Sequence, residues 1–234
     1  MRLTIKHWTE RRRSYKIFLS PTAGMYLLLL VSNVLLWENV ASNPTTLVSI
    51  EDLYHRVVEQ SHNTYIVAAD IYREFDLNFA KRSWLRDRIP SMCHTSSIHT
   101  PEDRKQVHET TTVDLLKAIL NVTYAWEEPV KHLLPAVTAL PGVSDNMMKK
   151  AVDMKGKIHI LVEGIETILN RTEPGFDGND YPAWTGLEDL KSSDEDTRLF
   201  TIYNLCRCLR RDTHKVDSYL KVLRCRVVFK NECF

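Results

Sequence analysis

The stretch CRCLRRDTHKVDSYLKVLRC, residues 206–225, combines an apolar stripe with a basic one and carries a cysteine at each end. If the stretch forms a helix, one face holds the apolar residues Leu209, Val216, Leu220 and Leu223. The opposite side is crowded with polar and basic residues, namely Arg207, Arg210, Arg211, His214, Ser218 and Lys221. One face of this helix is therefore suited to a protein core, and the other to water or to a partner.

Helical periodicity extends well beyond this stretch, whereas strand-like alternation is nearly absent. The pattern predicts four long helices, at about 50–79, 111–137, 144–170 and 193–226. The last begins at SSDED, where serines and acids suit the first turn of a helix, and Pro129 is expected to bend the second. The sequence therefore predicts an all-α fold.

The connections between the four segments are long, short and long. A helix of roughly 26 residues is about 39 Å long, so about a dozen extended residues are needed to return along its whole length. Only the two outer connections are long enough for that return. This order predicts an up-up-down-down four-helix bundle with two long crossover connections, as in the long-chain cytokines, rather than a simple up-and-down bundle.

The first residues have the three parts of a secretory signal peptide: a basic segment, RRRSYK, an apolar one, MYLLLLVSNVLLW, and a small-residue exit, ENVAS. We expect residues 1–42 to be removed by cleavage near Ala41 or Ser42, which leaves a single helical domain at 43–234. Translation from Met25 is an alternative start. The apolar run is shorter than the roughly 20 residues that span a bilayer, so we expect a secreted, extracellular protein without membrane insertion.

Several classes of function find little support in the sequence. The formal net charge is +1 and no broad basic surface is evident, which argues against nucleic-acid binding. The Cys206-Arg-Cys208 spacing is not that of a C-x-x-C redox motif, and no second cluster has the spacing of a metal site. We expect neither an enzyme nor a bound metal or cofactor. Two N-x-T sequons, at Asn121 and Asn170, are candidate glycosylation sites.

The chain has five cysteines, so in an oxidising compartment at least one thiol stays unpaired within the monomer. Cys225 and Cys233 are close in sequence and can close a small terminal loop. Cys93 needs a distant partner, and Cys206 and Cys208 lie about 200° apart around a helix. Only one of those two can readily face the connection that carries Cys93, and the residues alone do not decide which.

Three motifs make the chain similar to a known family. CHTSSIHTPEDRKQ, DYPAWTGLEDL and DEDTRLFTIYNLCRCLRRDTHKVDSYLKVLRCRVVFKNEC resemble the prolactin and growth hormone family, most closely its rodent placental lactogens. The resemblance covers nearly the whole chain and implies disulfides Cys93–Cys208 and Cys225–Cys233. It places Cys206 at a position that is apolar in prolactin, so we expect a buried free thiol there, with an intermolecular bridge as the alternative.

The resemblance also implies a function. It indicates a secreted, monomeric lactogenic hormone that binds two copies of a prolactin-type receptor ectodomain and thereby dimerises the receptor. The alternative is a placental relative that binds heparin-like matrix or another receptor. The implied first receptor face consists of His62, Arg210, Arg211, His214, Lys215, Tyr219 and Lys221. The residues alone favour a solvated helix face for this basic stripe, and only the resemblance favours a receptor face.

The second implied receptor face contains Gly164. A glycine in the middle of a helix costs up to about 1 kcal/mol relative to alanine, so a specific reason for it is expected. The resemblance implies that the missing side chain leaves a shallow cleft for the second receptor. Close packing between helices of the bundle is the other explanation. One departure from prolactin concerns the first face, where Tyr65 replaces a second histidine.

Overall fold

The computed structural model describes residues 48–79, 88–176, 180–230 and 232, which all belong to one unit, Val48–Phe234. The predicted signal peptide, residues 1–42, lies outside the described residues. The long helices are α2 (Ile50–Asn78), α5 (Thr112–Tyr124), α6 (Glu127–Thr138), α7 (Asp145–Thr172) and α9 (Glu195–Val228). No strand occurs in the described part, and the all-α prediction is confirmed.

Side-chain caps mark the starts of α2, α7 and α9. The Ser49 Oγ accepts a hydrogen bond from the Asp52 amide at the start of α2 (3.0 Å), and Ser144 does the same for Met147 in α7. Asp194 caps α9 by accepting from the Thr197 amide, 3.0 Å away. Each cap satisfies a backbone donor that has no partner within its helix.

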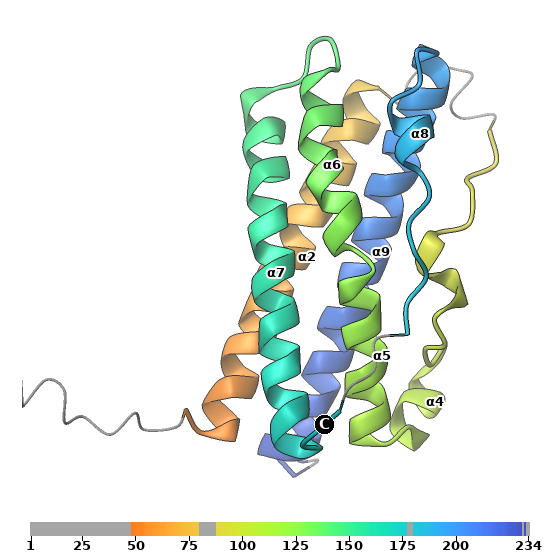
Figure 1. Cartoon of the computed structure of the whole chain (residues 1–234). Helices are drawn as coiled ribbons and strands as arrows, with labels where there is room; N and C mark the ends of the chain where they lie inside the picture. Colours follow the sequence, from red (N-terminus) through yellow and green to blue (C-terminus); the bar gives the residue numbers. More distant parts are fainter. Residues whose placement is uncertain (1–47, 80–87, 177–179, 231, 233–234) are drawn as a thin grey trace, which may run out of the picture. The chain divides into compact units, whose positions relative to one another are not determined.

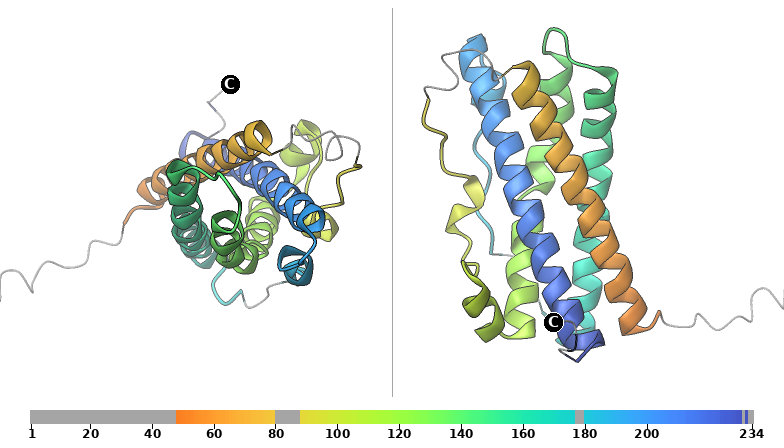
Figure 2. Two further views of the ribbon diagram at one scale, coloured as in Figure 1. Left: turned by 90° about the horizontal axis from the view of Figure 1, so that it is seen from above. Right: turned by 180° about the vertical axis from the view of Figure 1, so that it is seen from behind.

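The helices run in the predicted order, up, up, down and down (Figure 1). Helix α2 leads to a long connection that returns to the opposite end of the bundle before α5 and α6 run parallel to α2. Helix α7 then runs back. After the second long connection, which contains the short helix α8 (Leu187–Leu190), α9 runs in the same direction as α7 and packs against α2 and α5. Figure 2 shows α2 packed between α9 and α7, the two helices it contacts most.

The second helix of the bundle is broken rather than merely bent. Helix α5 ends at Tyr124 and α6 begins at Glu127, so the break precedes Pro129, where the bend was predicted. The physical reason is that a proline lacks an N–H and its ring crowds the carbonyl four residues earlier, here that of Ala125. His94 Nε2 lies 2.9 Å from this carbonyl oxygen and supplies the hydrogen bond that the helix cannot.

The first long connection contains two short elements, η1 (His94–Ser97) and α4 (Arg104–Glu109). It is tied to α9 by the predicted disulfide between Cys93 and Cys208, whose Cα atoms are 5.6 Å apart. Cys206 is a free thiol with no exposed surface in this structure. Cys225 is also disulfide-bonded, and its expected partner Cys233 lies outside the described residues.

Candidate binding face

The basic side chains between Arg207 and Lys221 of α9, together with Tyr219, form two rows that face different surroundings. The covered row lies under the first long connection and consists of Arg207, Arg211, Lys215 and Tyr219, spaced four residues apart. The open row faces solvent beside α2 and consists of Arg210, His214 and Lys221. The basic stripe of the sequence is therefore two surfaces with separate environments.

The covered row holds the first connection against the bundle. Arg207 donates to the carbonyl oxygen of Ser91 at 2.5 Å, and Lys215 Nζ donates to Thr100 Oγ1 at 2.7 Å. The Tyr219 hydroxyl donates to the carbonyl oxygen of Pro101. Tyr219 is only 7% exposed, because the connection covers it.

A buried carboxylate explains the position of Arg211. Asp212 is 1% exposed and accepts hydrogen bonds from Thr95 Oγ1 (2.6 Å) and Trp126 Nε1 (2.9 Å). The Arg211 guanidinium lies 2.7 Å from the other carboxylate oxygen and also donates to Thr95. Because a buried charge is costly unless it is paired and hydrogen-bonded, this cluster requires Arg211 to face the connection.

Burial also changes the titration of two members of the covered row. Desolvation lowers the pKa of Lys215, and the positive charge of Arg211 adds to this effect, while Asp212 opposes it. Desolvation raises the pKa of the Tyr219 hydroxyl. Both shifts follow from the connection that covers these side chains.

Two side chains of the open row contact aromatic rings of α2. The rings of Tyr65 and His214 touch edge to face with centroids 4.9 Å apart, and the Arg210 guanidinium lies 5.1 Å from the centre of the Tyr72 ring. Burial raises the pKa of Tyr72 to about 12. Cations and aromatic rings side by side on an exposed surface are typical anchors of protein interfaces.

Asp217 is buried beneath this exposed face and holds Lys221 in place. It is 3% exposed and accepts hydrogen bonds from Lys221 Nζ (2.7 Å) and Ser61 Oγ (3.1 Å). His62 Nδ1 lies 3.5 Å from the same carboxylate and 3.4 Å from Lys221 Nζ. Neither Asp217 nor Asp212 was predicted from the sequence, although the four-residue spacing of Asp217 and Lys221 is that of a helical ion pair.

A hollow of about 340 Å³ opens between α2 and α9 beside Arg210. Its walls carry both signs of charge and two aromatic rings; they consist of Tyr65, Ala69, Asp70, Tyr72, Arg73, Asp76 and Arg210. Asp70 is held by Arg73 at 2.7 Å and by Lys150 of α7 at 3.0 Å. The face thus offers an open polar cavity whose walls include two aromatic rings.

Gly164 lies where α7 approaches α2. A Cβ atom built on it would stand 2.7 Å from Cγ2 of Val57, which is closer than real Cβ contacts. Close helix packing therefore accounts for this glycine in the free protein. Gly156, also in α7, has nothing within 4 Å of such an atom, so it has no comparable packing role.

Other kinds of site find no support in the described residues. They contain no group of three or more His, Cys, Asp or Glu side chains that could hold a metal ion. Within the same part of the chain, no helix has the length and apolar character needed to cross a bilayer.

Comparisons with known proteins agree with this architecture. The chain is 66% identical to prolactin-3D4 of Rattus norvegicus over 90% of its length and 96% of that protein. It is 61% identical to prolactin-3D1 of Mus musculus, over 92% and 97% of the two chains, and 50% identical to prolactin-3B1 of Mesocricetus auratus, over 90% and 96%. The profile of the Somatotropin hormone family matches residues 29–233. This is a family of hormones and not of enzymes, and the chain belongs to it.

Proposed function

We propose that this chain is a secreted lactogenic hormone that binds and dimerises a cytokine receptor of the prolactin-receptor type. Residues 1–42 serve as its signal peptide, and the hormone acts as a monomer. The family and the prolactin names of the relatives support a hormone of this kind. The observation that carries the proposal is the exposed face that α2 and the open row form together.

The first receptor binds this face through His62 and the open row, with Tyr65 and the neighbouring hollow as anchor points. Exposed cations that are held in place by a buried carboxylate lose little side-chain entropy on binding, which favours affinity. Lys221 is held in this way by Asp217. The resemblance also implies receptor contacts for Arg211, Lys215 and Tyr219. In this proposal they act indirectly, because they hold the first long connection beside the α2–α9 face.

The second receptor binds on the side where α2 and α7 meet, around Gly164. The glycine contributes by allowing the two helices to lie close together, which shapes the surface above them. Ile160, one turn earlier in α7, is 54% exposed and offers apolar area to a partner. Two unlike faces on one bundle suit a hormone that brings together two copies of one receptor.

The stoichiometry of the complex with the prolactin-receptor ectodomain tests the proposal. Light scattering on the purified mixture should give two receptors per hormone. Arg210→Ala combined with Lys221→Ala should weaken the first association, whereas Lys149→Ala with Lys155→Ala, two exposed cations on α7, should leave it unchanged.

Two further variants test the second receptor face. Gly164→Arg and Ile160→Arg should each limit the complex to one receptor, and Ile160→Arg is informative even if Gly164→Arg folds poorly. A hormone that ignores the ectodomain and is retained on heparin would contradict the proposal and favour a matrix-binding relative.

A further inference from the structure

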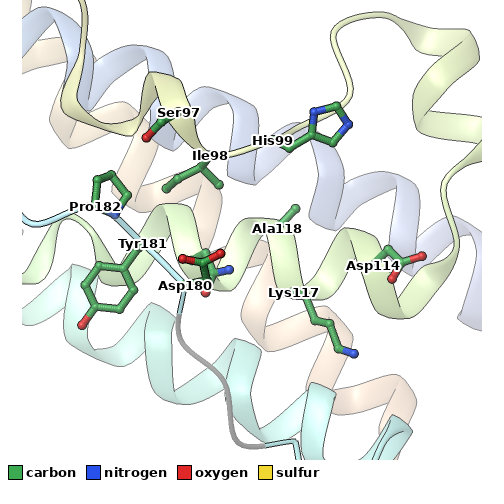
Figure 3. Close-up of a pocket in the computed structure, with 10 residues that line it drawn as sticks. Ser97, Ile98, His99, Asp114, Lys117, Ala118, Asp180, Tyr181 and Pro182 are labelled. Atoms are coloured by element: carbon green, nitrogen blue, oxygen red, sulfur yellow. The ribbon is translucent and has the colours of Figure 1, made fainter.

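The two long connections cover parts of α5 and α9 but leave the outer face of α7 exposed. Figure 3 shows residues 97–99 and 180–182, from the two connections, beside side chains of α5 such as Asp114 and Lys117. Helix α7 packs against α2, α5 and α6. On its outer side, nothing in the described part of the chain lies within 4 Å of a Cβ atom built on Gly156. This side of the bundle is therefore open to a partner.

Five exposed residues form a stripe along the outer face of α7. Gly156 is at its centre, Val152 and Ile160 lie about one turn away on either side, and Lys149 and Glu163 lie about one turn further out. With roughly 3.6 residues per turn, all five lie within about 40° of the direction of Gly156. Val152 is 56% exposed and Ile160 is 54% exposed, so the stripe presents apolar area on both sides of the glycine.

Packing within the bundle does not account for the glycine at the centre of this stripe. Glycine is among the poorest helix formers, and Gly156 faces open space rather than a neighbouring helix. A residue without a side chain allows the backbone of another molecule to approach closely. Gly156 therefore suits a contact with a helix of a partner.

The stripe is complementary to itself in antiparallel orientation. Around a two-fold axis at Gly156, a residue that precedes the glycine lies opposite the residue that follows it by the same number of positions in the second copy. Val152 is then opposite Ile160, and Lys149 is opposite Glu163. Because each pair occurs twice by symmetry, the contact brings together four apolar side chains and two ion pairs, and no like charges face each other within the stripe.

We propose that the outer face of α7 binds the same face of a second copy of this chain in an antiparallel, two-fold symmetric dimer. Such a dimer uses one patch on both subunits, so the patch must be complementary to itself. Helices that cross at roughly 20° stay in contact over several turns, which is enough to include both ion pairs. A contact between two single helices is small beside the roughly 1,200–2,000 Å² of a stable interface. The dimer therefore forms in concentrated protein and dissociates on dilution.

Dimer formation bears on receptor binding, and this step rests on the proposed function. Ile160 belongs both to the dimer contact and to the proposed second receptor face, so the second copy and the second receptor compete for it. Concentrated hormone is then a dimer that does not assemble two receptors. Dilution releases the monomer, which is the acting form.

Sedimentation velocity of the purified hormone, without receptor, tests the dimer. The wild-type protein should pass from monomer to dimer as its concentration rises from the low micromolar to the millimolar range. Lys149→Glu and Glu163→Lys each place like charges opposite one another, so each should raise the dissociation constant about tenfold or more. The matched control is Lys155→Glu, which makes the same change of charge about 100° around the helix from Gly156 and should leave the constant unchanged.

A mixture of the two single variants provides a second test. In the mixed dimer each introduced glutamate lies opposite an introduced lysine or a native one, and both charge pairs are again of opposite sign. The mixture of Lys149→Glu and Glu163→Lys proteins should therefore dimerise, although neither protein does so alone. Gly156→Glu, which has open space in the monomer, places two like charges at the axis and should abolish dimerisation without unfolding the chain.

Several results would overturn the inference. They are a wild-type protein that stays monomeric at millimolar concentration, single variants that dimerise as the wild type does, and a mixture that stays monomeric. A dimer that resists dilution and survives on a non-reducing gel is a disulfide-linked species, and it also overturns the inference. Because no receptor is present in these measurements, a hormone that fails to bind the receptor ectodomain contradicts the proposed function and leaves the dimer intact.

Discussion

Gly164 of α7 packs so closely against Val57 of α2 that a Cβ atom on the glycine would stand 2.7 Å from Val57 Cγ2. An alanine at Gly164 gains up to about 1 kcal/mol of helix propensity but overpacks the contact, which costs roughly 1–3 kcal/mol. We expect Gly164→Ala to lower the free energy of unfolding in urea, and to raise it when Val57→Ala has made room. The matched control is Gly156→Ala, which should be stabilising in both backgrounds. If Gly164→Ala changed the free energy of unfolding equally in the wild-type and Val57→Ala backgrounds, the contact with Val57 would not limit packing at this position.

Cys206 illustrates a second residue whose chemistry is set by its surroundings. Complete burial raises the pKa of its thiol to about 12, so almost no thiolate is present at neutral pH. We expect iodoacetamide to leave the native protein unmodified and to alkylate Cys206 once urea unfolds it. Mass spectrometry of the tryptic peptide measures this. Rapid labelling of the native hormone would mean that the thiol is accessible, as an intermolecular bridge would require.

At the scale of the helix, the two rows of α9 should respond differently to mutation. Arg211→Ala leaves the buried Asp212 without its cation and should lower the free energy of unfolding by about 1–3 kcal/mol. Arg210→Ala, at the adjacent exposed position, should change stability by less than about 0.5 kcal/mol. Urea unfolding of both variants measures the difference. Equal losses of stability would contradict the division into a covered and an open row.

The break between α5 and α6 gives the bundle a pH dependence. Desolvation lowers the pKa of His94 below its ordinary value of 6.5; Arg211 adds to this, while the Ala125 carbonyl and Asp212 oppose it. The unfolded chain therefore binds a proton more readily than the folded one. The contribution of His94 to stability is full above pH 6.5 and is lost as the pH falls below it.

His94→Gln should flatten this part of the dependence. Glutamine can still donate to the Ala125 carbonyl oxygen but does not titrate. We expect the urea midpoint of the native protein to fall more between pH 7 and pH 5 than that of the variant. Parallel curves for the two proteins would assign the pH dependence to other groups.

The positions of the helices were predictable from the sequence, but the surroundings of the α9 side chains were not. Helical periodicity and connection lengths were sufficient for the four helices and their directions, because both depend on local pattern and simple geometry. The division of the α9 cations was not predictable, since it depends on the course of residues 88–110, which have no regular period. Asp212 was missed for the same reason: its partners Thr95 and Trp126 are distant in sequence and meet it only in the fold.

For the molecule as a whole, the Cys93–Cys208 disulfide is the main covalent constraint in the described part of the chain. It joins residues 115 positions apart, and the chain-entropy model assigns about 4–5 kcal/mol to a loop of this length. Replacing both cysteines by alanine should lower the free energy of unfolding by about 4–5 kcal/mol, so the urea midpoint should fall. Urea unfolding monitored by circular dichroism checks this. An unchanged midpoint would mean that contacts of the covered row alone hold the first connection.

The same disulfide determines how the molecule carries a mechanical load. If the chain is pulled from its two ends, tension enters through α2, crosses from Cys93 to Cys208, and leaves through the second half of α9. The loop between the cysteines, residues 94–207, is about 400 Å long as extended chain and remains slack as long as the bond is intact. Helices α5, α6 and α7 lie within this loop, which carries no tension. Stretching would therefore separate α2 and the end of α9 from these three helices without applying force to them directly.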